Sequence, residues 1–489
     1  MKKIFIICLA LLCTIITDAQ NTFKAFIKDG KEKKPLQGAT ITIKALNKAT
    51  AADSLGFVIL NNIMAGKQKI VISHVGFQDK ELSFTFPLVS DETIEILLEE
   101  AEETTEEVVV TTTRSSRSIA SIPTRVETIS GEELEEKGNM KPGDIRMMLN
   151  ESTGIQTQQT SATSYNSSIR IQGLDGKYTQ IIRDGLPLYS GFSGGLGLLQ
   201  IVPLDLKQVE VIKGSASTLY GGGAIAGLVN LVSKVPKEER ELKFILNGTS
   251  ALGWDASGFY SQKFKKVGTT IFASYNHGAP YDPAKIGLTA IPKFDRYTIN
   301  PKIFFYFNSK TTMNFGVNTT FENRIGGDIK YIEGKADSIH SYFEKNKTNR
   351  YSTQLSFEHK INDNSRLSFK NSESYYDRSI QIPDYRFSGV QLSSYTEINY
   401  NYKKEKSEWI TGVNFLTDKF TQYKQETTIP VNYNQSTIGA FVQNTWNASK
   451  IITLETGLRG DYQNDYGFFI LPRISALFKI NNHLTSRIG

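Results

Sequence analysis

Residues 208–234 read QVEVIKGSASTLYGGGAIAGLVNLVSK, two β-type runs that flank a glycine-rich turn. Within this stretch, residues 221–226 match G-x-G-x-x-A, a spacing that cradles a dinucleotide when a helix follows it. The residues that follow here, beginning with Gly227 and Val229, have strand character, and no repeated strand–helix–strand pattern surrounds them. We therefore interpret the glycines as turn residues that allow close backbone approach in a packed domain.

Two earlier runs have the same character. Residues 168–174 read SIRIQGL and residues 180–187 read QIIRDGLP, after a predicted short helix at 143–149 and a predicted strand at 154–157. In their order and spacing, the three runs resemble the plug domain of TonB-dependent receptors. Two departures are Gln172 before Gly173, and Ser215 where the family often has proline. The residues that match the family's motif are Arg170, Gly173, Arg183, Asp184, Gly185, Glu210, Lys213, Gly214, Tyr220, Gly221, Gly227 and Asn230.

The resemblance implies a small α/β plug over residues 119–237, inside a β-barrel. Four charged side chains of the motif could bind a ligand: Arg170, Arg183, Asp184 and Glu210. Ion pairs that hold the plug to the barrel wall are the interpretation that we favour for them.

From residue 238 to 489, the alternation of residue types predicts part of a transmembrane β-barrel without reference to any family. Apolar or aromatic positions alternate with polar ones at 313–322 and 454–462, and apolar residues share one face at 409–415. Alternation over such long segments is typical of strands with lipid on one side and a polar lumen on the other. Such strands cross a membrane only as a closed barrel, because every backbone group in lipid must be paired. The alternative is a soluble protein of repeated hairpins.

The connections support a barrel as well. Short polar turns are predicted near 265–268, 308–310, 361–364, 403–406, 448–450 and 480–482. Longer loops are predicted at 278–295, 323–350, 377–387 and 418–436. Short turns at one end and long loops at the other are typical of outer-membrane barrels.

The pattern contains about 12 strands and the start of another. The family resemblance implies a 22-stranded barrel around the plug. The sequence ends at Arg487-Ile488-Gly489, inside a predicted strand and without the terminal aromatic residue typical of the family. We therefore expect an N-terminal fragment or a C-terminally truncated product.

Residues 1–19 have the features of a secretory signal peptide. Lys2 and Lys3 precede a short apolar stretch, and small residues permit cleavage after Ala19. An N-terminal anchor helix and a lipoprotein are the weaker alternatives. Both cysteines, Cys8 and Cys13, fall in this segment, so the mature chain is expected to have no disulfide and no thiolate metal site.

Residues 20–99 are predicted to form an antiparallel β-sandwich, because short β-type runs recur between turn clusters. These runs are 23–27, 39–43, 56–60, 68–73, 81–86 and 93–98. The segments PLQGA at 35–39, SLGF at 54–57 and SHVGF at 73–77 resemble the carboxypeptidase-regulatory-like domain, a non-catalytic module found ahead of outer-membrane receptors of the Bacteroidetes type. His74 lacks partner ligands at a useful spacing, so we interpret it as structural.

Residues 100–118 are interpreted as an acidic linker followed by a TonB box. Residues 91–107 hold nine acidic residues and no basic one, and EVVVTTT follows at 107–113. A β-branched segment with no local hairpin partner can add to the sheet edge of another protein. The alternative is that this segment simply begins the next domain. The residues of the predicted box are Glu107, Val108, Val109, Val110, Thr111 and Thr112.

Composition excludes several classes of protein. The 489 residues are 39% hydrophobic and 22% charged, with a mean hydropathy of −0.29, which fits neither a bundle of membrane helices nor a disordered chain. The net charge of +6 is not gathered into a stripe, so no nucleic-acid partner is expected. No P-loop, HExxH motif, EF-hand loop or nucleophile triad is present, and we expect neither an enzyme nor a bound cofactor or metal.

The family resemblance implies active uptake of a scarce nutrient across the outer membrane, driven by TonB. The expected partners are TonB, outer-membrane lipid and a small ligand, a metal chelate such as a ferric siderophore; cobalamin, haem and glycans are alternatives. The resemblance also implies a monomeric barrel with its N-terminal domain in the periplasm. A non-transporting surface or periplasmic binding protein is the rival hypothesis.

Candidate substrate contacts lie at the predicted plug apex, a small polar loop with two aromatic residues: Tyr189, Ser190, Gly191, Phe192 and Ser193. A purely structural loop is an equally good interpretation. Loop residues that form a second group of candidates are Tyr281, Asp282, Tyr331 and His340.

Overall fold

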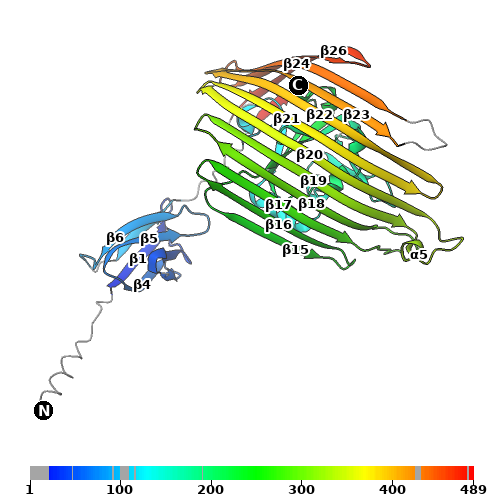
Figure 1. The fold of residues 1–489 in the computed structure, drawn as a ribbon. Coiled ribbons are helices and arrows are strands. Elements are labelled where there is room, and N and C mark those ends of the chain that lie inside the picture. Colours follow the sequence, from blue (N-terminus) through cyan, green and yellow to red (C-terminus); the bar gives the residue numbers. More distant parts are fainter. Residues whose placement is uncertain are drawn as a thin grey trace, which may run out of the picture. The chain divides into compact units, whose positions relative to one another are not determined.

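The computed structural model describes residues 21–46, 48–90, 93–99, 109–114, 117–189, 191–423, 431–481 and 484–489 (Figure 1). The predicted signal peptide lies outside the described residues. The chain divides into two compact units, Met1–Glu107 and Val108–Gly489. No helix among the described residues is long and apolar enough to cross a membrane.

The first unit is a β-sandwich. Its strands are β1 (Asn21–Asp29), β2 (Thr40–Ile43), β3 (Lys48–Ala51), β4 (Phe57–Ile63), β5 (Gly66–Ser73), β6 (Lys80–Phe86) and β7 (Ile94–Leu98). They form two sheets with the orders β4-β1-β7 and β3-β2-β5-β6. Alternating positions such as Phe23, Ile41 and Ile72 are buried in a shared apolar core, as the period-two pattern predicts.

Two details of this sandwich differ from the prediction. Strand β7 pairs with β1 in parallel, so the sandwich is not purely antiparallel. Strand β3 was not predicted, because its sequence, Lys-Ala-Thr-Ala, has no large apolar side chain on either face.

In the second unit, the plug is built on a mixed sheet. The strands of its two sheets are β8 (Val126–Ser130), β9 (Ile155–Gln159), β10 (Ser167–Ile171), β11 (Thr179–Arg183), β12 (Leu186–Tyr189), β13 (Leu206–Lys213) and β14 (Gly227–Ser233). The larger sheet has the order β12-β11-β14-β13-β8, and β9 pairs with β10. Its helices are α2 (Gly131–Met140), α3 (Arg146–Asn150) and α4 (Ser217–Tyr220). Helix α2 was not predicted, since Leu134 is its one large buried apolar residue.

The glycine-rich turn of 221–226 is followed by a strand, as predicted. A single 3-10 turn, η6 (Gly222–Ala224), leads into β14. Strand β14 then pairs with both β11 and β13 at the centre of the plug sheet. The helix that a dinucleotide site would need is absent from this described segment.

The remaining chain forms one thirteen-stranded antiparallel sheet, here called the barrel wall, in which consecutive strands pair (Figure 1). Its strands are β15 (Glu241–Gly248), β16 (Trp254–Phe264), β17 (Val267–Gly278), β18 (Lys293–Tyr306), β19 (Thr311–Gly327), β20 (Phe343–Asn362), β21 (Ser365–Ile382), β22 (Tyr385–Lys404), β23 (Ser407–Gln422), β24 (Tyr433–Asn447), β25 (Ile452–Gln463), β26 (Gly467–Lys479) and β27 (Thr485–Ile488).

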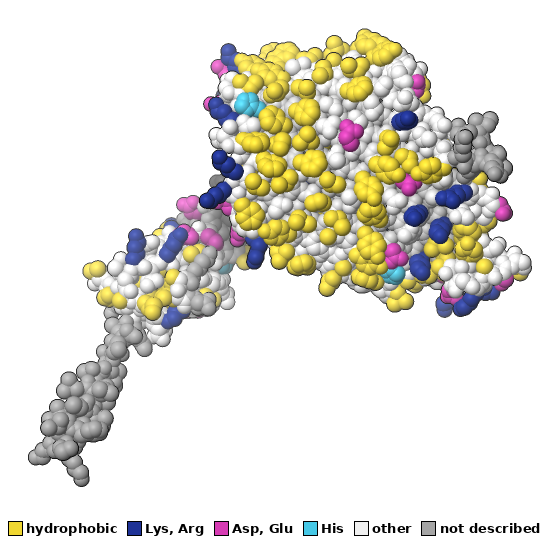
Figure 2. Space-filling view, in the orientation of Figure 1, with side chains coloured by type: hydrophobic (Ala, Val, Ile, Leu, Met, Phe, Trp, Pro, Cys, Tyr) yellow, Lys and Arg dark blue, Asp and Glu magenta, His cyan; other side chains and the backbone are white. Residues whose placement is uncertain are grey.

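The two faces of the barrel wall differ in chemistry. Exposed apolar and aromatic side chains such as Ile398, Val413 and Leu458 cover the outward face, and Figure 2 shows them spread over much of it. Polar side chains such as Asn276 and Gln354 are buried on the other face, toward the plug. This is the arrangement expected of strands between lipid and a polar lumen.

One predicted loop is wrong. Residues 377–387 were expected to form a long connection. Strand β21 instead extends to Ile382 and β22 begins at Tyr385, so only two residues separate the strands. The other long connections are present but shorter than predicted, at 279–292, 328–342 and 423–432. Polar residues at the ends of long strands resemble loop residues, because outside the lipid no apolar face is required.

The close packing behind Gly227 gives a test of the plug fold. Gly227 has a φ of 153°, and a Cβ there would overlap the Ile212 carbonyl oxygen and lie 2.9 Å from Ile171 Cδ1. We expect Gly227→Ala to lower the free energy of unfolding by about 1–3 kcal/mol. The measurement is the thermal unfolding midpoint of the protein in detergent, together with protease sensitivity of the plug. Gly223→Ala is the matched control, because no atom lies within 4 Å of its Cβ position; equal effects of both changes would contradict this account.

Candidate functional site: the plug and its contacts with the barrel wall

The end of the predicted TonB box is bound to one carboxylate of the plug. The Thr111 amide donates to Glu210 Oε1 and the Thr112 amide donates to Glu210 Oε2, each at 2.8 Å. On the other side, the Tyr220 hydroxyl donates to the Thr112 carbonyl at 2.7 Å. The side chain of Glu210 therefore takes the place of a neighbouring strand for these two residues.

Glu210 is fully buried, and neutral donors surround it. Besides the two amides, Gln208 Nε2 donates at 2.6 Å and Asn230 Nδ2 at 3.1 Å. Asn230 also donates to the Thr111 hydroxyl at 2.9 Å. A buried carboxylate is tolerated when its oxygens accept several hydrogen bonds. Removing the box would leave this charge with fewer donors, which favours the bound arrangement.

The rest of the box is only partly described. Val110 is completely buried and packs in an apolar cluster with Ile122 and Val126, while Val109 forms an isolated antiparallel bridge to Ser118. Glu107 and Val108 lie outside the described residues.

Two buried arginines just after the box join the plug to the barrel wall. Arg114 donates from Nε to Glu397 at 2.9 Å and from Nη2 at 2.5 Å, in β22. Arg117 donates from Nε to Glu408 of β23 at 2.9 Å. All four side chains are less than a tenth exposed. The sequence prediction missed these pairs, because nothing local marks Glu397 or Glu408 as a partner of residues almost 300 positions away.

Asp184 is the motif carboxylate that bonds directly to the barrel wall. Its Oδ2 accepts from Lys302 Nζ of β18 at 2.8 Å, and its carbonyl accepts from Lys370 Nζ of β21 at 2.6 Å. Burial alone would raise the pKa of Asp184, but Lys302 and Arg183 outweigh that effect and lower the pKa to about 2. Arg183 itself pairs with Asp205 inside the plug.

The other motif residues have roles within the plug. Lys213 bonds to Glu127 and to the Thr153 carbonyl. The Nε of Arg170 is buried without a hydrogen-bond partner among the described residues. The motif glycines that adopt a positive φ are Gly173, Gly185, Gly214, Gly221 and Gly227. Of the four charged residues predicted to pair with the wall, only Asp184 has a wall partner among the described ion pairs.

At the plug apex, Phe192 inserts into an aromatic cage of the barrel wall. Its ring centroid lies 5.6 Å from Tyr376, 5.7 Å from Phe387 and 4.7 Å from Phe420. Tyr433 extends the cage, with its ring 5.7 Å from that of Phe420. The cage is drawn from strands β21 to β24, near the long-loop end of the lumen, and its Tyr376 and Phe420 rings are buried.

Polar contacts fix the same loop. The Ser193 amide donates to Gln391 Oε1 at 2.6 Å, and Arg350 Nη2 donates to the Ser193 carbonyl at 2.8 Å. The guanidinium of Arg350 also lies 4.0 Å from the ring centroids of both Tyr189 and Tyr376. Gly191 approaches the Tyr433 hydroxyl closely. Ser190 lies outside the described residues. Most of the predicted apex contacts are thus gathered against the wall rather than on an open surface.

The loop candidates have partners within their own loops. Tyr331 stacks on Phe343 with ring centroids 4.4 Å apart, and His340 Nδ1 lies 2.8 Å from Asp337. Asp282 accepts from the Gly287 amide at 2.6 Å, and Tyr281 bridges to Ile291. Within the described ranges, no group of three His, Cys, Asp or Glu residues could hold a metal ion.

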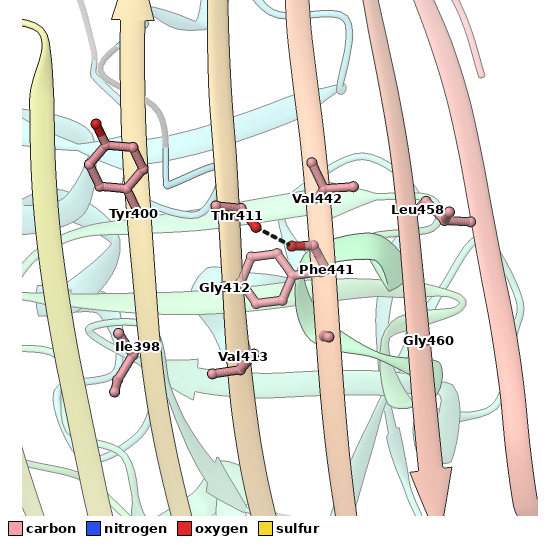
Figure 3. A pocket seen from close by; sticks show the side chains of 10 residues that line it. Ile398, Tyr400, Thr411, Gly412, Val413, Phe441, Val442, Leu458 and Gly460 are labelled. Carbon is pink, nitrogen blue, oxygen red and sulfur yellow. Dashed lines mark hydrogen bonds between the residues drawn. The ribbon is translucent and has the colours of Figure 1, made fainter.

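A shallow apolar groove of about 510 Å³ lies on the outward face of β22 to β25 (Figure 3). Its lining includes the small residues Thr411, Ala440 and Gly460, and the Thr411 hydroxyl donates to the Phe441 carbonyl at 3.1 Å. Because its walls are outward side chains such as Tyr400 and Leu458, the groove faces away from the lumen and from the apex cage.

Three family models match in the order of the structural parts. They are the CarboxypepD_reg-like domain over residues 26–110, the TonB-dependent Receptor Plug Domain over 118–228, and the TonB dependent receptor-like beta-barrel over 285–489.

Two curated relatives match a segment of the chain. The ferric aerobactin receptor of Klebsiella pneumoniae is 32% identical over 152 residues, which is 31% of this chain and 19% of the relative. The vitamin B12 transporter BtuB of Vibrio vulnificus (strain YJ016) is 26% identical over 143 residues, 28% of this chain and 23% of the relative. The matches thus span about a fifth of the length of these relatives.

Solved structures share the fold at low identity. The ferric-catecholate import receptor Fiu of E. coli K12 superposes with a TM-score of 0.58 at 15% identity, covering 76% of this chain and 69% of that one. The ferric yersiniabactin uptake receptor FyuA of Yersinia pestis gives 0.59 at 14% identity, covering 74% and 63%. With the sandwich, the plug and the wall matched in sequence order, the chain belongs to the TonB-dependent receptors, a family of outer-membrane barrels, and carries a CarboxypepD_reg-like domain ahead of its plug.

Proposed function

We propose that this protein takes up a ferric siderophore across the outer membrane and that TonB supplies the energy by pairing with the box at 107–112. The observation that carries this proposal is the attachment of Thr111 and Thr112 to Glu210. An extended segment held by side-chain hydrogen bonds can leave them for main-chain hydrogen bonds with an added strand.

The attachment has a suitable strength for a reversible step. A hydrogen bond to a charged group contributes about 1.5–3 kcal/mol. A partner strand that pairs with the same amides offsets part of that loss, and Glu210 keeps Gln208 and Asn230 as donors. The buried pair of Arg114 and Glu397 behaves differently, because breaking it leaves an unpaired buried charge at a cost of about 3–5 kcal/mol. Pulling on the box would therefore free residues 109–112 before it moves the plug.

The ligand end of the proposal rests on the apex cage. Phe192, Phe387 and Tyr433 are half-buried aromatic side chains of the cage. Arg350 and Arg378 place positive charge beside it. Ring faces and cations together suit an anionic chelate that carries aromatic ligand groups. Several similar solved structures are receptors for ferric chelates, including ferric enterobactin and ferric yersiniabactin receptors.

Cobalamin is the second candidate ligand, because the vitamin B12 transporter is among the matched relatives. In either case the long loops face the outside, and the box and the first unit face the periplasm, where TonB is reached. Uptake assays with both ligand classes distinguish the two candidates.

A proline in the box tests strand addition. Val110→Pro removes a main-chain donor, so we expect energy-dependent uptake to fall at least tenfold while ligand binding at the cell surface is retained. Because Val110 is buried, Val110→Thr is the matched control: it keeps the amide and the β-branch, and uptake should persist. Undiminished uptake in the proline variant would count against this box.

Removal of the Glu210 carboxylate tests the attachment of the box. In a Val110→Cys background, whose thiol is buried while the box is attached and is unique once the signal with Cys8 and Cys13 is cleaved, we expect Glu210→Ala to speed maleimide labelling about tenfold. The reason is that two amides lose a charged acceptor. Glu127→Gln, a change in the adjacent strand β8 with no described contact to the box, is the control and should leave the labelling rate unchanged. The attachment model fails if both variants label like the parent.

A change at the apex tests the cage. Phe192→Ala removes a ring that contacts three others, and we expect the affinity for a transported aromatic chelate to fall about tenfold, as the loss of aromatic pairs implies. Phe192→Leu keeps the loop packed without a ring face and should also bind weakly if ring stacking is what matters. Equilibrium binding of the radiolabelled ferric chelate is the measurement, and wild-type affinity in both variants would remove the apex from the site.

A further inference from the structure

A narrow cavity, here called the interface cavity, lies between the plug and the barrel wall. Its wall side is drawn from β18, β19 and β20, and its plug side from β12 and the end of the 3-10 turn η5 (Gly197–Gln200). Its volume of about 20 Å³ gives room for one water-sized species. The polar wall residues that line it are Thr298, Asn300, Asn318, Thr320, Arg350 and Ser352.

Arg350 brings a positive charge to the interface cavity without a carboxylate to balance it. Its side chain is 4% exposed and forms no ion pair within the described part of the chain. Its Nε donates to Gln200 Oε1 at 3.1 Å, and its Nη2 donates to the Ser193 carbonyl at 2.8 Å. The ring centroids of Tyr189 and Tyr376 each lie 4.0 Å from the guanidinium. All of these partners are neutral, and a buried charge without a counter-ion is costly.

The carboxylates near the cavity are already paired with other arginines. Arg183, the second charged residue of the lining that faces Arg350, pairs with Asp205. Glu322 accepts from Arg324 Nε at 2.6 Å and lies 3.9 Å from Arg296 Nη1. Two arginines therefore share one carboxylate there, and neither pairing offsets the remaining positive charge of the cavity.

Unused hydrogen-bond donors belong to the same lining. Arg350 Nη1, Asn318 Nδ2 and the Thr298 hydroxyl are buried atoms without a hydrogen-bond partner among the described residues. Asn300 Oδ1 is a lining acceptor in the same condition. Donors thus outnumber acceptors among the unpartnered atoms that line the cavity.

The register of the wall places these donors around one point of the lumen face. Thr298 of β18 is directly opposite Thr320 of β19, which is directly opposite Arg350 of β20. Asn318 precedes Thr320 by two residues and so lies on the same face of β19. A water molecule here would bond to the donors and leave the charge of Arg350 uncompensated. An anion would do both.

We propose that the interface cavity binds a monovalent anion of the size of chloride, held by Arg350 Nη1, Asn318 Nδ2 and the Thr298 hydroxyl. Hydrogen bonds from a cation to an anion are among the strong ones in proteins. A cavity of about 20 Å³ is too small for sulfate or phosphate. The site is separate from the proposed ligand site, because Arg350 turns Nη2 to the apex loop and Nη1 to the cavity.

The direct test is a crystal of the detergent-solubilised protein grown with bromide in place of chloride, because bromide is located by its anomalous scattering. We expect an anomalous peak in the interface cavity. Asn318→Asp should abolish it, since the new carboxylate supplies the counter-ion for Arg350 in nearly the same volume. Asn314→Asp is the matched control: it lies four residues away on the same face of β19, outside the cavity, and should leave the peak unchanged.

A second measurement compares the thermal unfolding midpoint in sodium chloride and in sodium methanesulfonate at equal ionic strength. We expect the parent and Asn314→Asp to unfold about 2–5 °C higher in chloride. Asn318→Asp should unfold at the same temperature in both salts. If that variant does not fold, Thr298→Val removes one donor at nearly constant shape and should lower the bromide affinity about fivefold.

A cavity that holds water and no bromide in the parent overturns the inference, as does full bromide occupancy in both Asn318→Asp and Thr298→Val. An equal dependence on chloride in the parent and in Asn318→Asp also contradicts it. No transported ligand and no TonB are needed for these measurements. Loss of the proposed uptake function would therefore leave the anion site standing, and absence of the halide would refute the anion site alone.

Discussion

The barrel wall is a single strand thick, and this constraint governs the rest of the second unit. One face of each strand meets lipid and the other meets the lumen, while every backbone group has to be paired within the sheet. Each strand from β16 to β25 pairs with a neighbour on both sides, which meets that requirement in this part of the described wall. The inward face is therefore polar, and the plug cannot be held to it by apolar packing over large areas. It is held by specific hydrogen bonds and ion pairs instead, such as Arg114 with Glu397 and Asp184 with Lys302.

The plug is therefore stabilised in one way inside its own core and in another way at its surface toward the wall. Its own core is apolar, built around residues such as Val209, Val229 and Leu231 of the central strands. Its surface toward the wall is polar, so individual contacts there are directional and can be broken one at a time. Apolar contacts with the wall occur at three places: Phe192 packs against three aromatic rings at the apex, Leu219 clusters with Ile410 and Phe441, and Val202 clusters with Phe259 and Phe272. A ligand that competes for the rings around Phe192 would loosen an apolar contact between the plug and the wall. That contact is separate from the attachment of the box to Glu210.

Sequence patterns predicted the parts of this structure that depend on local periodicity. Alternation at 313–322 and 454–462 became β19 and β25, and the glycine turn before Gly227 led into a strand as expected. The prediction failed outside the lipid, where strands no longer need an apolar face, and where strand direction leaves no trace in the alternation. Strands β21 and β22 extend past the lipid, so their polar ends read as a loop. Strand β7 is parallel to β1, which a run of alternating residues does not reveal.

The contacts of the candidate site could not be predicted from local sequence patterns. The box and Glu210 were recognised as separate motif elements, yet their contact joins residues 99 apart in sequence. The pairs of Arg114 with Glu397 and Arg117 with Glu408 span still longer separations and leave no periodic signal. Each charge, taken singly, looks like any other charge on a polar face. Only the register of the wall shows that these particular carboxylates point inward at the height of the box.

The spacing of these contacts along the chain orders the events that a pulling force can cause. Force applied at the box reaches the Glu210 attachment first, at Thr111 and Thr112, and the Arg114 pair two residues later. The first set consists of hydrogen bonds whose amides an added strand can pair, while Glu210 keeps Gln208 and Asn230 as donors, so part of the cost of release is offset. The second set is a buried ion pair for which no replacement arrives, so it resists more strongly. Under the proposed function, binding of a partner at the box and movement of the plug would be separate steps, because the Arg114 pair follows the Glu210 attachment by two residues. Uptake would then need work beyond binding, which is the role that an energy-transducing partner supplies.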